Sequence, residues 1–222
     1  MFDLAGQMQT VTVRRLAGGE DDMITIGITG GVGCGKSKVL EYISNNYNCK
    51  IILSDDVANQ IKEPGESCYQ PLIELLGTDI LGEDKYIDKK KMAAKIFADD
   101  SLLSKVNDIL HPAVKDYILA QKALEADRGE IDYLFVEAAL LIECGYNEHV
   151  DEMWYIYAPV DVRTKRLKES RGYSDEKIKA IMDAQLTEEQ FREGSDFVID
   201  NGGSLESTYE QLKVKLSTYI KG

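Results

Sequence analysis

The chain has 222 residues, of which 44% are hydrophobic and 29% are charged, a composition typical of a folded globular protein and not of a disordered one. Its 26 Lys and Arg against 39 Asp and Glu give a net charge of −13, which argues against a general nucleic-acid binder, because phosphate-backbone affinity depends on clustered cations. No segment approaches the roughly 20 apolar residues of a membrane helix, so we expect no membrane partner.

Residues 1–22 show no sustained periodicity, and we interpret them as a flexible extension before a single domain over 23–222. They lack the apolar segment of a signal peptide, so none is expected. The four cysteines form no C-x-x-C pair, which favours free thiols and a cytoplasmic protein. They are Cys34, Cys49, Cys68 and Cys144.

Five short apolar runs predict β-strands, at residues 23–29, 50–53, 132–136, 153–157 and 197–199. Helical stretches separate them, beginning with residues 36–45. Apolar strands that alternate with helices are typical of a parallel sheet covered on both faces, so we predict a three-layer α/β/α domain with a five-stranded parallel sheet.

The stretch between the second and third predicted strands is too long for one crossover. Apolar residues recur in it at helical spacing on both sides of Pro112. We interpret it as a helical subdomain, about 57–129, inserted into a core of about 23–56 and 130–222. A final apolar face, with Leu205, Tyr209, Leu212, Leu216 and Tyr219, predicts a C-terminal helix packed on that core.

The strongest motif is GGVGCGKS at residues 30–37, which fits G-x-x-x-x-G-K-[ST] between a predicted strand and a predicted helix. Small residues let consecutive backbone N–H groups surround phosphate oxygens, and the helix N-terminus adds positive potential. Lys36 supplies a mobile cation, and the Ser37 hydroxyl is a ligand for Mg²⁺. Cys34 within this phosphate-binding loop (P-loop) is interpreted as a tolerated small residue.

Acidic residues follow two of the predicted strands, where ligands of parallel sheets bind. Asp55 and Asp56 follow the second strand, and each either serves the site or caps the next helix. Glu137 ends the third strand and suits a Mg²⁺ held through water. Glu143, after an apolar run, either faces the substrate or is an exposed loop acid.

Five cations lie between Arg163 and Arg171, at positions 163, 165, 166, 168 and 171. They form either a solvated helix face or a lid that brings arginine to a transferred phosphoryl group. The chain lacks the N-K-x-D motif of guanine-nucleotide switches. Its size, inserted helices and basic cluster favour a small-molecule kinase, with a non-kinase nucleotide-binding switch as the alternative.

Taken together, these residues resemble the dephospho-coenzyme A kinase family from residue 23 to near the C-terminus. The family's D-A-D…Arg…P-G segment is similar to Leu53-Ser54-Asp55…Asn59…Pro64-Gly65, a register that selects Asp55 and not Asp56 as base. Further family motifs resemble His111-Pro112, residues 137–143, Arg166, Gln185 and residues 195–201. The chain departs from the family pattern at Leu53, Asn59, Lys89 and Ser170, where the family has Asp, Arg, Arg and a second lid Arg.

The resemblance implies a P-loop fold of the nucleoside monophosphate kinase type, with a lid at about 161–192. It implies ATP-dependent phosphorylation of the ribose 3′-hydroxyl of dephospho-CoA, with Mg²⁺, by a protein expected to be monomeric. Another small nucleoside or nucleotide kinase is the alternative. The expected catalytic residues are Lys36, Asp55 and Arg166, and the metal site is Ser37 and Glu137. The loop Gly31, Val32, Gly33, Cys34, Gly35, Lys36, Ser37 and Lys38 is expected to hold ATP, and Asp55, Lys89, His111, Leu140 and Glu143 the acceptor. His111 has a second interpretation, as a helix-terminus residue before Pro112.

Overall fold

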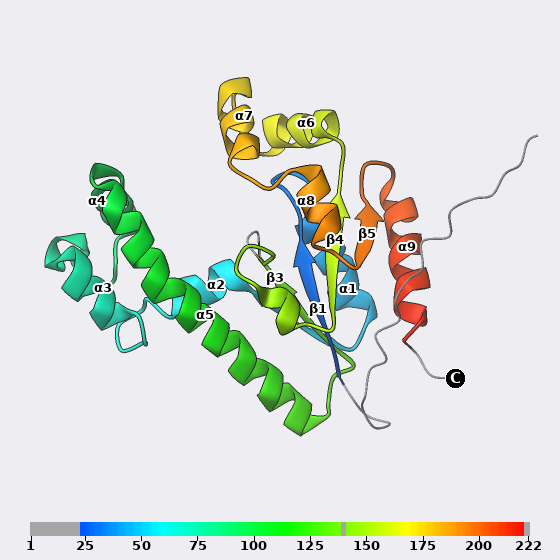
Figure 1. Cartoon of the computed structure of the whole chain (residues 1–222), viewed down its shortest axis with the longest axis horizontal. Coiled ribbons are helices and arrows are strands. Elements are labelled where there is room, and N and C mark those ends of the chain that lie inside the picture. The colour runs from blue at the N-terminus through cyan, green and yellow to red at the C-terminus, as the bar shows by residue number, and fades with distance from the viewer. Residues whose placement is uncertain (1–22, 139–140, 220–222) are drawn as a thin grey trace, which may run out of the picture.

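The computed structural model describes residues 23–138 and 141–219. Within them, five strands form one parallel sheet in the order β2-β3-β1-β4-β5 (Figure 1). The strands are β1 (Ile24–Thr29), β2 (Cys49–Leu53), β3 (Tyr133–Glu137), β4 (Glu152–Tyr157) and β5 (Phe197–Asp200). The predicted three-layer fold with a five-stranded parallel sheet is confirmed. Each apolar run forms a strand, and β1, β3 and β4 are buried on both faces, whereas the edge strands β2 and β5 are only partly buried.

Helices cover the two faces of the sheet. On one face α1 (Lys36–Asn46) and α9 (Leu205–Ser217) enclose a core that includes Phe135 and Trp154, both fully buried. On the other face α5 (Asp100–Arg128) packs on Leu134 and Val136. The alternation of Leu134, Phe135 and Val136 between the two cores follows from the two-residue period of a strand.

Part of the helical region between β2 and β3, at the left of Figure 1, extends away from the sheet. The helices of this region are α2 (Ser54–Gln60), α3 (Tyr69–Leu76), the 3-10 turn η1 (Thr78–Ile80), α4 (Lys89–Ala98) and α5. Leu72, Leu76 and Ile80 bury their side chains in the same core as Val106 of α5. This arrangement agrees with the predicted helical insertion, whose limits as an independent subdomain stay a prediction.

Helix α5 continues through Pro112, so the interpretation of His111 as a helix-terminus residue is wrong. Proline has no N–H, so the Asp108 carbonyl receives no helical hydrogen bond from residue 112. The helix continues because it is packed both before and after the proline. Val106 precedes Pro112, Val114 and Ile118 follow it, and all three side chains are buried in the same core.

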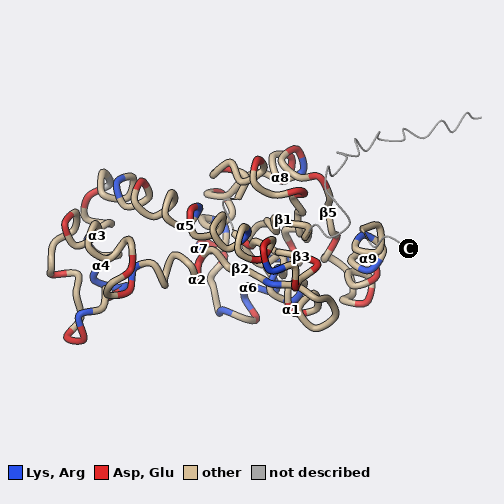
Figure 2. Tube along the Cα trace, turned by 90° about the horizontal axis from the view of Figure 1, so that it is seen from below, with Lys and Arg blue, Asp and Glu red and all other residues tan. Residues whose placement is uncertain are grey.

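After β3 the chain forms η2 (Tyr146–Glu148) and β4, and then three helices before β5: α6 (Val160–Arg171), α7 (Asp175–Asp183) and α8 (Glu188–Glu193). Figure 1 shows α6 and α7 beyond the carboxyl ends of the strands. Figure 2 shows acidic and basic residues interspersed along the described chain. Among the described helices, none is long and apolar enough to cross a membrane.

Candidate active site

The loop between β1 and α1 is a compact turn of small residues. The Cys34 N–H donates to the Gly31 carbonyl at 3.1 Å, which folds the loop back on itself. Gly35, the residue before α1, has a φ of 95°, a conformation that glycine adopts without strain. The turn therefore delivers the chain to a helix N-terminus, whose unpaired amides and partial positive charge favour an anion.

Lys36 connects this loop to the end of β3. Its Nζ donates to the Gly30 carbonyl at 2.6 Å and lies 3.5 Å from Oε1 of Glu137. Burial raises the pKa of Glu137, Lys36 opposes the rise, and the nearby Asp55 and Asp56 add to it. Acidic groups from β3 and α2 thus share one corner with a single P-loop cation.

The strand register explains why these groups meet. Glu137 lies opposite Ile28 of β1 on one side and opposite Leu53 of β2 on the other. Helix α2 begins at Ser54, directly after Leu53, and no side chain caps it. Because Asp55 and Asp56 lie inside the first turn, the interpretation of either as the helix cap is wrong.

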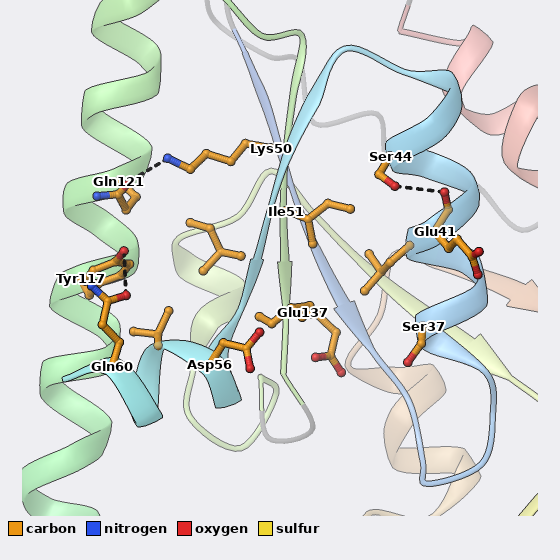
Figure 3. Close-up of a pocket in the computed structure, with 14 residues that line it drawn as sticks. Ser37, Glu41, Ser44, Lys50, Ile51, Asp56, Gln60, Tyr117, Gln121 and Glu137 are labelled. Atoms are coloured by element: carbon orange, nitrogen blue, oxygen red, sulfur yellow. Dashed lines mark hydrogen bonds between the residues drawn. The ribbon is translucent and has the colours of Figure 1, made fainter. Parts of the chain in front are cut away.

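The two aspartates point into different cavities. Asp56 lines a cavity of about 640 Å³ together with Ser37 and Glu137, and Figure 3 shows these three side chains at one end of it. Asp55 lines a separate cavity of about 220 Å³ between α2 and α5. Consecutive helical residues project about 100° apart, so one step in the sequence moves a carboxylate from one cavity to the other.

The residues at the corner fit the Mg²⁺ that this kind of site implies. Mg²⁺ binds through one or two carboxylates, phosphate oxygens and retained waters, and seldom in an all-protein cage. Ser37 and Glu137 offer a hydroxyl and a carboxylate on the same cavity. Burial is the main cause of the raised pKa of Glu137, and the negative charges of Asp55 and Asp56 add to it; a divalent cation beside the carboxylate would oppose both effects. Among the described residues, no three His, Cys, Asp or Glu side chains are grouped so that they could hold a metal ion.

Two arginines of the basic cluster contact the P-loop. Arg163 Nε donates to the Val32 carbonyl at 2.8 Å, and its guanidinium lies over Gly31. Arg166 donates to the carbonyls of Cys34 and Asn201, at 3.2 and 2.8 Å. The other three cations of the cluster are exposed. The solvated-face interpretation fits these three cations, and the lid role of Arg163 and Arg166 stays a prediction.

Gln185, in the segment between α7 and α8, also reaches the P-loop. Its Oε1 accepts a hydrogen bond from the Val32 N–H at 2.9 Å and one from Arg163 Nη2 at 3.3 Å. The sequence motif points to Gln185, but nothing in the residue pattern predicts that its side-chain oxygen accepts a hydrogen bond from a backbone N–H of the P-loop. This contact links the lid region to the P-loop through the Val32 N–H, a donor to which a phosphate oxygen would also bind.

Cys34 and Asn201 support the loop from behind. Cys34 is buried, and burial raises the pKa of its thiol, so the thiolate is disfavoured. The Asn201 amide donates to the Cys34 carbonyl at 2.7 Å, and the Thr208 hydroxyl donates to Asn201 Oδ1 at 2.9 Å. These contacts agree with the interpretation of Cys34 as a small residue tolerated within the turn.

On the helical side, Lys62 lies close enough to Lys89 and Asp55, two of the predicted acceptor residues, to interact electrostatically with both. Burial lowers the pKa of Lys62, nearby Lys89 lowers it further, and Asp55 opposes the shift. Lys89 itself begins α4 and is exposed. Sequence reasoning missed Lys62. The family has an arginine at the position of Asn59, and a cation only three residues later was a signal that could have pointed to Lys62.

The remaining predicted residues are more scattered. His111 lines the smaller cavity, where its Nδ1 lies 3.8 Å from the Cys144 sulfur. Glu143 is exposed, as is Lys38, whose Nζ pairs with Glu41 at 2.6 Å. Leu140 lies outside the described residues. Binding roles for these four residues stay predictions.

Comparison with known proteins gives a consistent result. A family model described as "Dephospho-CoA kinase" matches residues 24–207. A dephospho-CoA kinase of Carboxydothermus hydrogenoformans is 37% identical over 187 residues, which cover 84% of this chain and 90% of that protein. The solved dephospho-CoA kinase from Campylobacter jejuni is 25% identical with a TM-score of 0.66, covering 87% of this chain and 96% of that one. TT1252 from Thermus thermophilus is 29% identical with a TM-score of 0.73, covering 90% and 100%.

Proposed function

The chain belongs to the dephospho-CoA kinase family, and from that premise we propose how its residues carry out the reaction. The protein is an ATP-dependent kinase that phosphorylates dephospho-CoA in the last step of coenzyme A biosynthesis. The acceptor group is the ribose 3′-hydroxyl, and the products are CoA and ADP. The single observation that carries the assignment of roles is the convergence of Lys36, Glu137 and the α2 aspartates at the carboxyl ends of three neighbouring strands.

The P-loop binds the phosphates of ATP. Backbone N–H groups from Gly31 to Ser37 face the phosphate oxygens, and Lys36 exchanges its contact with Gly30 for the transferred phosphoryl group. Positioning and electrostatic stabilisation supply most of the catalysis in phosphoryl transfer, so a cation that tracks the moving charge is worth several kilocalories per mole. Gln185 releases the Val32 amide when a phosphate oxygen replaces it.

Ser37 and, through water, Glu137 would hold Mg²⁺, which would supply charge neutralisation at the phosphates. Glu137 can do this because Lys36 holds its carboxylate beside the loop at 3.5 Å. Asp56 lines the same cavity and contributes further negative charge.

Asp55 orients the acceptor hydroxyl and takes its proton. The assignment is supported by its place in the first turn of α2, on the cavity that does not contain Ser37. A base must lie within hydrogen-bond reach of the hydroxyl while remaining clear of the metal, and Asp55 meets the second condition better than Asp56.

The lid comprises α6 to α8, with Arg166 as its main catalytic cation and Arg163 or Arg171 beside it. Arg163 and Arg166 already contact P-loop carbonyls, so a small rotation of α6 brings guanidinium groups over the transferred phosphoryl group. Closure also excludes water, which limits wasteful hydrolysis.

The protein acts as a cytoplasmic monomer, with ATP, Mg²⁺ and dephospho-CoA as its small-molecule partners and without nucleic acid or membrane. All four cysteines are free, in agreement with a reducing compartment. A coupled ADP-release assay tests the function. Dephospho-CoA should give rapid ADP release, whereas AMP, CMP and nucleosides should not; equal turnover of AMP would favour another nucleotide kinase.

A further inference from the structure

The cavity that contains Asp55 has a second polar wall that the mechanism does not use. It lies between α2 and one face of α5, and Ala138 after β3 borders it. Ala58, Leu110 and Val114 give it an apolar lining, and Asn107 adds an amide. Asn107, His111 and Val114 are four and three residues apart, so they project from the same face of α5.

The size of the cavity restricts what it can hold. Its volume is about 220 Å³. Pockets that enclose a whole drug-sized ligand measure roughly 300–1,000 Å³, so this cavity suits one flat ring system and not a complete nucleotide. Its apolar walls favour the faces of such a ring, which contact aliphatic side chains well.

Asn107 is the part of the lining that can identify the ring. Its side chain is half-buried and makes no hydrogen bond to any residue in the described ranges 23–138 and 141–219. A carboxamide presents a donor and an acceptor side by side. This pair matches the 6-amino group of adenine and an adjacent ring nitrogen, a pairing that asparagine makes with adenine in nucleic acids.

The position of Asp55 connects the ring to the reaction. The acceptor hydroxyl and the base are attached to the same ribose, so a hydroxyl at Asp55 places the base within one sugar ring of that carboxylate. We propose that the 220 Å³ cavity binds the adenine of the acceptor and that Asn107 identifies it, with Oδ1 accepting from the 6-amino group and Nδ2 donating to the neighbouring ring nitrogen. This inference rests on the proposed role of Asp55.

The other polar side chains of the lining support the same arrangement. His111 lies one turn after Asn107 on the same face of α5, and its Nδ1 lies 3.8 Å from the sulfur of Cys144, which also lines the cavity. Neither the imidazole nor the thiol presents a donor and an acceptor side by side, so neither can bind the 6-amino group and the adjacent ring nitrogen of adenine at the same time. Ser54 and Tyr146 add single hydroxyl groups, and among the lining residues only Asn107 carries a carboxamide, so discrimination between bases is assigned to Asn107.

The test compares dephospho-CoA with an analogue whose adenine is replaced by unsubstituted purine, which lacks only the 6-amino group. The wild-type enzyme should use the analogue with a kcat/KM about 5- to 150-fold lower, because one bidentate asparagine–adenine pair discriminates by that factor. Asn107→Leu should use dephospho-CoA as poorly as the wild type uses the analogue, and should no longer distinguish the two acceptors. Its KM for ATP should match that of the wild type.

Asn45→Leu, an exposed position on α1, is the matched control and should retain the full discrimination. Equal use of the two acceptors by the wild type would overturn the proposal even if Asn107→Leu failed to fold. Full discrimination retained by folded Asn107→Leu would also overturn it. Failure of the wild type to phosphorylate dephospho-CoA at all would instead refute the proposed function, and the two failures are thereby distinguished.

Discussion

Lys36 Nζ lies 3.5 Å from Oε1 of Glu137, so the P-loop lysine and the acid that ends β3 form an ion pair across two neighbouring strands. Both side chains are largely buried, with 15% and 17% of their surfaces exposed. The pair keeps the lysine at the loop in the absence of phosphate, and it keeps the carboxylate beside Ser37.

Lys36→Ala should lower kcat/KM by about 30- to 1,000-fold. The variant loses a charge-stabilising donor, a change that removes about 2–4 kcal/mol of transition-state stabilisation. Steady-state kinetics with saturating Mg²⁺ measure the effect. Lys213→Ala, at an exposed position on α9, is the control and should behave like the wild type. Full turnover by Lys36→Ala would remove the assigned role.

Glu137→Gln should be more stable than the wild type at neutral pH although it is less active. Burial raises the pKa of Glu137, so the folded state binds this proton more tightly than the unfolded state does. The free energy of unfolding contributed by this group is therefore fully present below the ordinary value of 4.5 and is lost as the pH rises through the raised pKa. Glutamine mimics the protonated form and escapes that loss.

Urea unfolding of the two proteins at pH 7 and at pH 4 measures this difference, which should be present at pH 7 and shrink at pH 4. Glu169→Gln, on the exposed side of α6, is the control and should change the free energy of unfolding by less than about 0.5 kcal/mol. A Glu137→Gln protein less stable than the wild type at pH 7 would show that the ion pair with Lys36 outweighs burial.

Asp55→Asn should reduce kcat by about 10²- to 10⁴-fold while ATP binding remains nearly intact, because the variant removes a general base from the acceptor cavity. Asp56→Asn should have a much smaller effect on kcat. Because Asp56 lines the cavity with Ser37 and Glu137, its change should appear as a higher Mg²⁺ requirement. A larger loss of kcat in Asp56→Asn than in Asp55→Asn would exchange the two roles.

Gly31→Ala should displace Arg163 and lower kcat. A Cβ at Gly31 would lie 2.9 Å from Nη1 of Arg163, closer than real contacts permit, and the guanidinium is the flexible partner that must move. Gly203→Ala is the matched control, because a Cβ there meets no atom within 4 Å. Kinetics of both variants, and of Arg163→Ala, measure the effect: Gly31→Ala should match Arg163→Ala. Wild-type turnover in Gly31→Ala would show that the Arg163 contact does not serve catalysis.

Much of the fold and part of the site were predictable from local sequence. The five strands are short apolar runs, and the P-loop combines small residues with a fixed Lys-Ser ending, so both signals lie within a few adjacent residues. Helix α5 was harder, because proline is a local signal for a helix end and only tertiary packing carries the helix through Pro112. Local rules describe the chain well wherever one segment determines its own conformation.

The contacts between distant segments were not predictable. Gln185 and Val32 are 153 positions apart, and only the placement of the α7–α8 segment brings them to 2.9 Å. Likewise, Asp55 and Asp56 are chemically identical neighbours, and only the direction of α2 assigns them to separate cavities. Asn107 gave no signal at all, since a lone asparagine on a helix has no pattern.

The order of the strands has a mechanical consequence for the reaction. The P-loop follows β1 and the proposed acceptor base follows β2, and β3 lies between them, so two interstrand spacings of about 4.8 Å separate the strand ends that carry these groups. That span is defined by the backbone hydrogen bonds of the parallel sheet. Movements of the outlying helices can admit or release substrates without altering the distance between the two anchoring points.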